Sequence, residues 1–274
     1  MTEIMKPIPV VVVGGTGYVA GELLRLLAAH PQFQVAASVS VSQSGGSIVE
    51  AFPHLRGTDY DDMSFEPLEN VAGCHFKSGR SIGVFTATPH GKTAPILGEL
   101  LGKARDVNAS VKVVDLSADF RFPTDAEYSA VYGHPHGAPD WLDAFTCSVP
   151  ELFSGKPLAH AVQPGCFTTA TTLAAFPFFG LDLVEDDVFV SAITGSSGSG
   201  RTPGVGTHHP ERRSNLHAYS ALGHRHEAEM RMFLSRARLG ASPQVDFVPH
   251  SGPFVRGIHA TLRMTLRQNQ SAQF

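Results

Sequence analysis

Cys166 is the residue whose type and setting most directly suggest covalent chemistry. It stands in QPGCFTTATTLAAF, where Pro164 and Gly165 predict a turn and Thr168 onward predicts a helix that Pro177 ends. A thiol near a helix N-terminus is favoured as the thiolate, because the unpaired amides and the helix dipole stabilise negative charge. Since the thiolate is the nucleophilic form, Cys166 is a candidate catalytic nucleophile.

Two histidines in the same half of the chain could serve this cysteine. His224 and His226 lie in ALGHRHEAEM, just before a helix predicted over 227–237. Histidine donates or accepts protons near neutral pH, so either one together with Cys166 forms the minimal set for acyl transfer. The residue types alone leave open which histidine acts and whether either one contacts the cysteine.

A metal centre is the competing use for the 14 histidines. Three pairs lie close in sequence, at His134/His136, His208/His209 and His224/His226. None of the pairs has ligand spacing of the CxxC or HExxH kind, so we predict no metal site.

A second motif, near the N-terminus, predicts a dinucleotide site. Gly14, Gly17 and Ala20 form GxxGxxA between an apolar run and a helical pattern, which is a close relative of the dinucleotide fingerprint. Glycines there permit a tight turn and a close approach to a pyrophosphate, whose charge the helix N-terminus attracts. The predicted cofactor contacts in this turn are Gly14, Gly15, Thr16, Gly17, Tyr18 and Val19.

The end of the second predicted strand indicates which dinucleotide binds. The segment SVSVSQS carries Ser38 and Ser40 where an NAD enzyme usually places an acidic residue for the ribose hydroxyls. Both serines are predicted cofactor contacts, and the missing carboxylate favours NADP. No arginine lies nearby in the sequence to hold a 2′-phosphate.

Strands that alternate with helices must position the glycine motif. The run IPVVVV, residues 8–13, has no polar alternation, which is typical of a parallel strand covered on both faces. Further strands are predicted at 33–41, 82–86 and 111–116, and helices before Pro31 and at 94–101. This alternation predicts an α/β fold whose N-terminal domain, residues 1–165, is a doubly wound Rossmann-type sheet.

The second half of the chain predicts a different scaffold. Residues 120–165 are aromatic and proline-rich and are predicted to be loop, with a domain boundary near their end. Beyond it, helices are predicted at 168–175 and 227–237, and strands at 188–194, 246–249 and 259–266. Residues 166–274 therefore form a predicted α+β catalytic domain.

Composition excludes several other classes of protein. The 274 residues are 42% hydrophobic and 17% charged, which indicates a globular chain rather than a disordered one. The formal net charge of −4 gives no basic excess for nucleic acid, and no segment resembles a signal peptide or a membrane span. Three cysteines, an odd number, favour a reducing cytoplasm, with Cys74 and Cys147 structural.

Several segments taken together resemble one family. In chain order they are GGTGYVAGEL, VFTATPHG, VVDLSADFRF, SVPEL, QPGCFTTA, GSSGSGR, AYSALGHRHEAEM and PHSGPFVRGI. Over nearly the whole chain they resemble the N-acetyl-gamma-glutamyl-phosphate reductases, relatives of aspartate-semialdehyde dehydrogenase. The resemblance implies that Cys166 attacks an acyl phosphate, phosphate leaves, and NADPH reduces the thioester to a semialdehyde in arginine biosynthesis. It also implies a homo-oligomer, dimer or tetramer, with dimerisation through the C-terminal domain.

Carried over position by position, the resemblance assigns further residues. Cys166 matches the nucleophile, and His224, which follows the glycine of GHRH, matches the acid/base better than His226. The loop from Gly195 to Gly200 matches a loop that holds the acyl phosphate, and polar residues around it match substrate contacts. The implied substrate contacts are Gln163, Ser196, Ser197, Gly198, Arg201, Glu211 and Arg256.

The chain also departs from the family pattern. Gln163 replaces an asparagine, Phe167 and Thr168 replace tyrosine and proline, and Ala228 replaces a proline. The segment THHPER resembles the lysine-biosynthesis branch, whose substrate is a carrier-linked aminoadipyl phosphate. Family members usually continue past the last predicted strand, so the chain is expected to lack a closing helix. The alternatives are that aminoadipyl substrate, a truncated non-catalytic NADP-binding protein, or a cysteine hydrolase that would leave the glycine motif unexplained.

Overall fold

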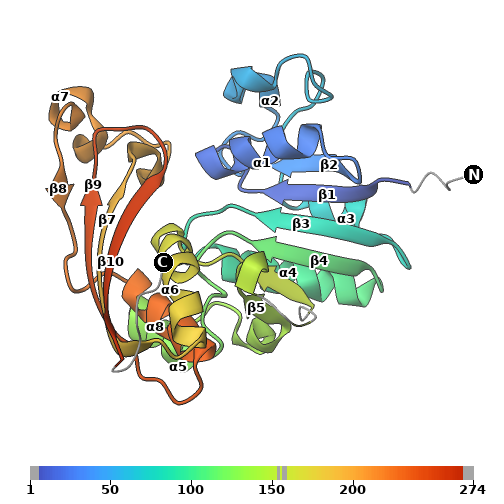
Figure 1. The fold of residues 1–274 in the computed structure, drawn as a ribbon. Coiled ribbons are helices and arrows are strands. Elements are labelled where there is room, and N and C mark those ends of the chain that lie inside the picture. The colour runs from blue at the N-terminus through green and yellow to red at the C-terminus, as the bar shows by residue number, and fades with distance from the viewer. Residues whose placement is uncertain (1–5, 153–154, 156–158, 268–274) are drawn as a thin grey trace, which may run out of the picture. The chain divides into compact units, whose positions relative to one another are not determined.

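The structure is a computed structural model that describes residues 6–152, 155 and 159–267. The chain divides into two compact units (Figure 1). The first contains the chain as far as Ser148 and the segment that ends at Gln163, and the second contains the short segment that starts at Val149 and the chain from Pro164 onward. The glycine motif therefore belongs to the first unit, and Cys166 with both histidines belongs to the second.

A six-stranded parallel sheet forms the centre of the first unit, in the order β2-β1-β3-β4-β6-β5. Its strands are β1 (Ile8–Val13), β2 (Phe33–Val39), β3 (Ser81–Thr86), β4 (Ser110–Asp115), β5 (Phe145–Cys147) and β6 (His160–Val162). Val10, Val11 and Val12 of β1 are completely buried, as expected for a strand covered on both faces. The strand order reverses between β1 and β3, and open α/β sheets bind ligands at such a switch point.

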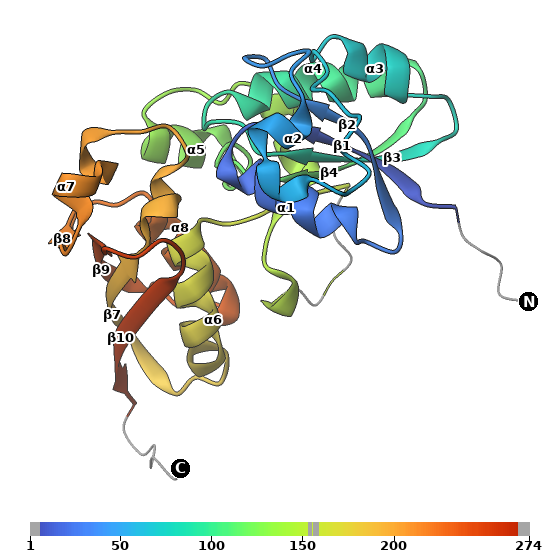
Figure 2. The ribbon, with the colours of Figure 1, turned by 90° about the horizontal axis from the view of Figure 1, so that it is seen from above.

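Helices cover both faces of this sheet. They are α1 (Tyr18–Ala28), α2 (Ile48–Ala51), α3 (Asn70–His75), α4 (Thr93–Asp106) and α5 (Asp125–Tyr132). Figure 2 shows α1 on one side of the sheet and α3 with α4 on the other. The doubly wound fold predicted from the alternation of strands and helices is therefore confirmed.

The prediction that residues 120–165 form loop was wrong at the strands β5 and β6 and at the helix α5. Thr124 caps this helix by accepting a hydrogen bond from the N–H of Glu127 at 3.2 Å, and Gly133 ends it with a φ of 77°. Tyr128 in the helix is only 1% exposed. The aromatic composition that suggested a loop therefore belongs partly to a packed helix.

A four-stranded mixed sheet, in the order β10-β7-β9-β8, forms the second unit together with helices. Its elements are α6 (Cys166–Gly180), β7 (Val184–Thr194), α7 (His209–Arg212), β8 (His217–Ala218), α8 (His226–Ala237), β9 (Gln244–Ser251) and β10 (Ile258–Leu266). The helices α6 and α8 pack against each other and against the sheet, where Phe179, Met230 and Phe247 are completely buried. This arrangement confirms the predicted α+β class.

The helix α6 is longer than predicted at both ends. It starts at Cys166 instead of Thr168 and runs through Pro177 to Gly180. Pro177 costs one helical hydrogen bond, but Phe179 is completely buried in the core and holds the last turn in place. Tertiary packing therefore carries the helix past the proline that was predicted to end it.

Three features that bear on function are absent from the part of the chain that the structure describes. No helix there combines the length and the apolar character needed to cross a bilayer. No group of three or more His, Cys, Asp or Glu side chains is placed to hold a metal ion. None of Cys74, Cys147 and Cys166 forms a disulfide.

Candidate active site

Cys166 occupies the first position of a long helix. It begins α6, which has 15 residues, and Gly165 before it is the N-cap. Cys166 is also exposed. The amides of the first turn and the helix dipole therefore act on an accessible thiol, and both favour its thiolate form.

Glu229 of α8 holds the start of α6. The N–H of Gly165 donates a hydrogen bond to Oε2 of Glu229 at 2.8 Å, and the hydroxyl of Thr168 donates to the same oxygen at 2.9 Å. Glu229 is completely buried, so the two donors it satisfies lie away from water. The position of Cys166 therefore depends on a side chain of the neighbouring helix, a contact that the sequence analysis missed.

His226 packs directly on the turn before Cys166. It is the first residue of α8 and is 6% exposed. A Cβ atom added to Gly165 would lie 2.3 Å from Nε2 of His226, far inside van der Waals contact. Only glycine at position 165 leaves room for this ring, so the structure brings His226 against the backbone that precedes the cysteine.

His224 lies beside His226, with ring centroids 4.5 Å apart. Its Nδ1 accepts a hydrogen bond from the backbone N–H of His226 at 3.1 Å, so the neutral ring carries its proton on Nε2. Burial, and then the positive charge of Arg225, lower the pKa of His224 from 6.5 to about 4, although Glu229 acts in the opposite direction. His224 is therefore a neutral N–H donor at pH 7.

Tyr219 joins this group, although the sequence analysis did not single it out. Its ring centroid lies 5.8 Å from that of His224. Burial, and then the charge of Cys166, raise its pKa, while Arg225 lowers it. The backbone N–H of Tyr219 donates to the carbonyl of Pro249 at 3.0 Å, which fixes its segment beside β9. The sequence signal that could have identified Tyr219 is its position five residues before His224, in AYSALGH.

The loop predicted to hold the acyl phosphate follows β7 as a short 3-10 helix, Ser196–Ser199. The N–H groups of Ser196 and Ser197 donate to the carbonyls of Phe254 and Val255 at 2.9 and 3.0 Å. A Cβ atom on Gly195 would lie 2.6 Å from the carbonyl oxygen of Val255. The structure therefore brings Ser196, Ser197 and Gly198 beside the segment that contains Arg256.

Three predicted substrate contacts are less clearly placed. Arg201, which follows the loop, and Glu211 in α7 are both exposed. Gln163 belongs to the first unit at the end of β6, where its carbonyl accepts a hydrogen bond from Nε of Arg121 at 3.1 Å. A substrate role for each of these three residues stays a prediction.

The glycine turn of the first unit lies at the switch point between β1 and β3. Gly14 has a φ of 97°, and a Cβ atom there would lie 2.6 Å from the carbonyl carbon of Ala87. Gly17 is the N-cap of α1, and among the described residues no atom outside its own turn of the chain lies within 4 Å of a Cβ added to it. The turn is therefore closed on the side of the sheet and open at the start of α1, where Tyr18 and Val19 are exposed.

The serines predicted to contact the cofactor are buried beneath this turn. Ser38 is completely buried, and its hydroxyl oxygen would lie 2.8 Å from a Cβ atom on Gly15. Ser40 is 4% exposed and accepts a hydrogen bond from the N–H of Gln43 at 3.2 Å. Direct contact of either serine with a cofactor stays a prediction, and the close packing on Gly15 requires a small side chain at Ser38.

Two family models match this chain. Residues 9–144 match the semialdehyde dehydrogenase, NAD binding domain, and residues 166–273 match the semialdehyde dehydrogenase, dimerisation domain. The N-acetyl-gamma-glutamyl-phosphate reductase of Pseudomonas fluorescens (strain Pf0-1) is 39% identical over 261 residues, which cover 93% of this chain and 71% of that protein. The protein of the same name from Ectopseudomonas mendocina (strain ymp) is 41% identical over 258 residues, covering 93% and 71%.

Solved structures share the fold at low sequence identity. Aspartate semialdehyde dehydrogenase II from Vibrio cholerae, complexed with ASA, has a TM-score of 0.64 and 14% identity, and the match covers 96% of this chain and 75% of that one. Aspartate semialdehyde dehydrogenase with NADP from Candida albicans has a TM-score of 0.60 at 14% identity, with 97% and 73% covered. At this identity the likeness concerns the fold alone.

Replacing Glu229 with alanine should loosen the start of α6. The substitution leaves the N–H of Gly165 and the hydroxyl of Thr168 without their buried acceptor, and we expect the free energy of unfolding to fall by about 2–4 kcal/mol. Urea denaturation followed by circular dichroism measures this change. Glu50→Ala, at an exposed position of α2, is the matched control and should cost less than about 0.5 kcal/mol. Equal losses in the two variants would contradict the role given to Glu229.

The protein should lose stability as the pH falls from 6.5 to 4, in part through His224. Because the folded state lowers the pKa of His224 from 6.5 to about 4, the unfolded state binds more protons between these values, and acid favours it. His160, whose pKa burial also lowers to about 4, adds to the same window. Thermal unfolding across this range should show a flatter decline for His224→Gln than for the wild type, and an unchanged slope would argue against a neutral, buried His224.

Proposed function

The chain belongs to the semialdehyde dehydrogenase family, and we propose that it reduces N-acetyl-gamma-glutamyl phosphate to N-acetylglutamate semialdehyde and phosphate with NADPH, a step of arginine biosynthesis. The observation that carries the proposal is Cys166 at the first position of α6 with His224 and His226 at the start of α8. Relatives that are 39% to 41% identical over most of this chain bear the name of that reductase.

Cys166 supplies the nucleophile. Its thiolate attacks the acyl carbon, the bond from that carbon to the phosphate oxygen breaks, and phosphate leaves with the electron pair. The product of this step is a thioester at Cys166. After reduction of the thioester carbonyl, the carbon–sulfur bond breaks, the semialdehyde is released and the thiolate is restored.

His224 is suited to donate a hydrogen bond in both steps. Its Nδ1 already accepts the N–H of His226, so its proton lies on Nε2. A neutral donor of this kind stabilises the acyl oxygen as that oxygen gains negative charge in a tetrahedral intermediate. His226, packed on Gly165, positions the backbone of the nucleophile, and so we assign the donor role to His224.

The glycine turn fits a dinucleotide. The space at Gly17 is open, and the first turn of α1 carries no acidic residue that would repel a pyrophosphate. Residues 38–46, SVSVSQSGG, also lack a carboxylate, which favours NADP over NAD. When bound, NADPH supplies the hydride that reduces the thioester.

The proposal includes a homo-oligomer in the cytoplasm. Residues 166–273, which contain the candidate nucleophile, match a family model described as a dimerisation domain. Three cysteines that form no disulfide fit a reducing compartment. The proposed substrate is a small-molecule acyl phosphate.

Cys166→Ser should abolish the reaction while NADPH still binds. A serine hydroxyl has nearly the size of the thiol but is not ionised at neutral pH. We expect kcat to fall by at least about 1000-fold in phosphate-dependent oxidation of N-acetylglutamate semialdehyde, followed by NADPH absorbance. Cys74→Ser, at another exposed cysteine, is the matched control and should keep the wild-type rate. Full activity of Cys166→Ser would refute the thiol mechanism.

Gly17→Asp should weaken NADPH binding without harming the fold. Position 17 has ordinary extended backbone angles, with φ at −81°, and space for a side chain, and aspartate is a good N-cap residue. Its carboxylate would repel the pyrophosphate, so we expect the Kd of NADPH to rise at least roughly tenfold relative to Gly17→Asn. Asparagine matches aspartate in shape and capping, so equal affinities in the two variants would place the pyrophosphate elsewhere.

A further inference from the structure

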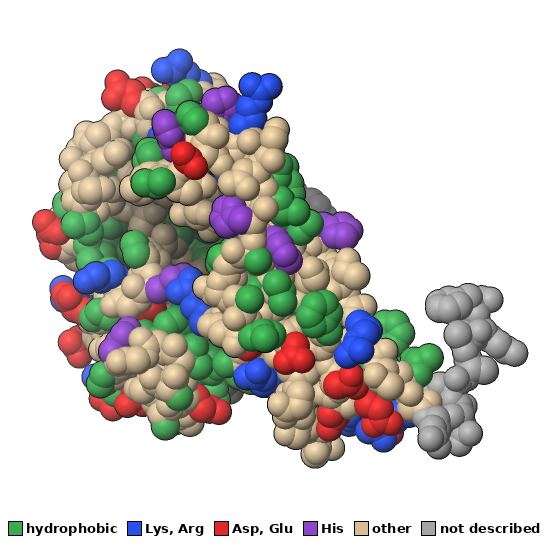
Figure 3. All heavy atoms as spheres, turned by 90° about the vertical axis from the view of Figure 1, so that its left-hand side faces the viewer, with side chains coloured by type: hydrophobic (Ala, Val, Ile, Leu, Met, Phe, Trp, Pro, Cys, Tyr) green, Lys and Arg blue, Asp and Glu red, His purple; other side chains and the backbone are tan. Residues whose placement is uncertain are grey.

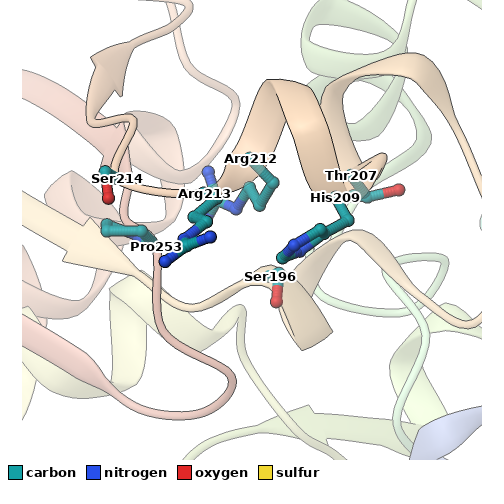
Figure 4. Close-up of a pocket in the computed structure, with 7 residues that line it drawn as sticks. All are labelled: Ser196, Thr207, His209, Arg212, Arg213, Ser214 and Pro253. Carbon is teal, nitrogen blue, oxygen red and sulfur yellow. The ribbon is translucent and has the colours of Figure 1, made fainter.

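A polar pocket in the second unit contains groups that none of the assigned roles uses. It has a volume of about 420 Å³ and lies where segments that follow β7 and β9 meet α7 (Figure 4). Its lining residues are Ser196, Thr207, His209, Arg212, Arg213, Ser214 and Pro253. Ser196 is also part of the loop predicted to contact substrate, so the pocket adjoins that loop.

The pocket is basic. His209 and Arg212 belong to α7 and Arg213 follows it, whereas no lining residue is acidic. Within the described residues, no carboxylate forms an ion pair with Arg212 or Arg213. Figure 3 shows basic, histidine and some acidic side chains at the top of the view, at the height where Figure 1 places α7. The charge of the pocket therefore favours an anionic occupant.

Arg212 has hydrogen-bonding capacity to spare. It is 7% exposed, and its Nη2 donates a hydrogen bond to the carbonyl of Gly252. Its Nε and Nη1 are shielded from solvent and have no partner among the described residues. A buried guanidinium with unsatisfied N–H groups is costly. An oxyanion in the adjoining pocket would balance the positive charge of this guanidinium.

We propose that this pocket binds an oxyanion of the substrate, with Arg212 and Arg213 as its charged partners and His209 as a further polar lining residue. The inference rests on the proposed function. The acyl phosphate offers two groups of this chemistry, its carboxylate and its phosphate, and both accept charge-assisted hydrogen bonds from guanidinium. The pocket thereby selects substrates that carry an anionic group besides the acyl carbon that reacts.

Thermal unfolding tests the pocket without turnover. Wild-type protein, with NADP present to fill any anion site at the glycine turn, is titrated with inorganic phosphate or with N-acetylglutamate, and sodium chloride holds the ionic strength constant. At least one of the two anions should raise the Tm beyond the chloride baseline. Stabilisation by phosphate alone identifies the phosphate group as the occupant, and stabilisation by N-acetylglutamate alone identifies the carboxylate. No stabilisation by either would overturn the proposal.

Variants assign the binding to Arg212. Arg212→Gln should raise the half-saturating anion concentration at least roughly tenfold, and Arg212→Lys should recover part of the affinity. Arg56→Gln, at an exposed arginine of the first unit, is the control and should bind the anion as the wild type does. If Arg212→Gln fails to fold, the exposed Arg213→Gln decides, with a loss of at least about threefold. Wild-type affinity in the deciding variant would overturn the proposal.

The two proposals fail separately. The anion titration requires neither hydride transfer nor Cys166, so Cys166→Ser should bind the anion as the wild type does. Anion binding that depends on Arg212 in a protein without reductase activity would contradict the proposed function alone. Reductase activity in a protein whose anion affinity is unchanged by Arg212→Gln would contradict this inference alone.

Discussion

The start of α6 is the constraint on which the chemistry of the second unit depends. One oxygen of Glu229 accepts hydrogen bonds from Gly165 and Thr168 and ties the turn before Cys166 to α8. Because α8 begins at His226, a single helix–helix contact holds the candidate nucleophile and the histidines together. A site built on packed helices holds its groups more precisely in place than one built on loops.

In both units, glycines let backbone segments approach each other closely. Cβ atoms on Gly14, Gly165 and Gly195 would collide with Ala87, His226 and Val255, respectively. At each of these positions the missing side chain lets one segment press against another and leaves backbone amides near a strand end or a helix start. Gly17 differs because its surroundings are open, which is what the approach of a pyrophosphate requires.

Local patterns predicted much of this fold, and long-range contacts escaped them. The valine run predicted β1, and the helical spacing of apolar residues before Pro31 predicted α1, because both depend only on neighbours along the chain. The setting of Cys166 at a helix start was predicted for the same reason. Glu229 and Arg212 were not predicted, since their partners, Gly165 and Gly252, lie far away in sequence and meet them only through packing. The helix α5 was missed because the core residue Tyr128 added to an aromatic composition that suggested a loop.

The thioester at Cys166 is tested most directly by omitting phosphate from the reverse reaction. N-acetylglutamate semialdehyde and NADP are mixed with the enzyme in phosphate-free buffer, and NADPH absorbance and intact protein mass are followed together. We expect a burst of one NADPH for each active site, one acyl group on Cys166, and turnover that starts when phosphate is added, because phosphate accepts the acyl group. Steady turnover without phosphate, or a burst that leaves no acyl group on Cys166, would contradict it.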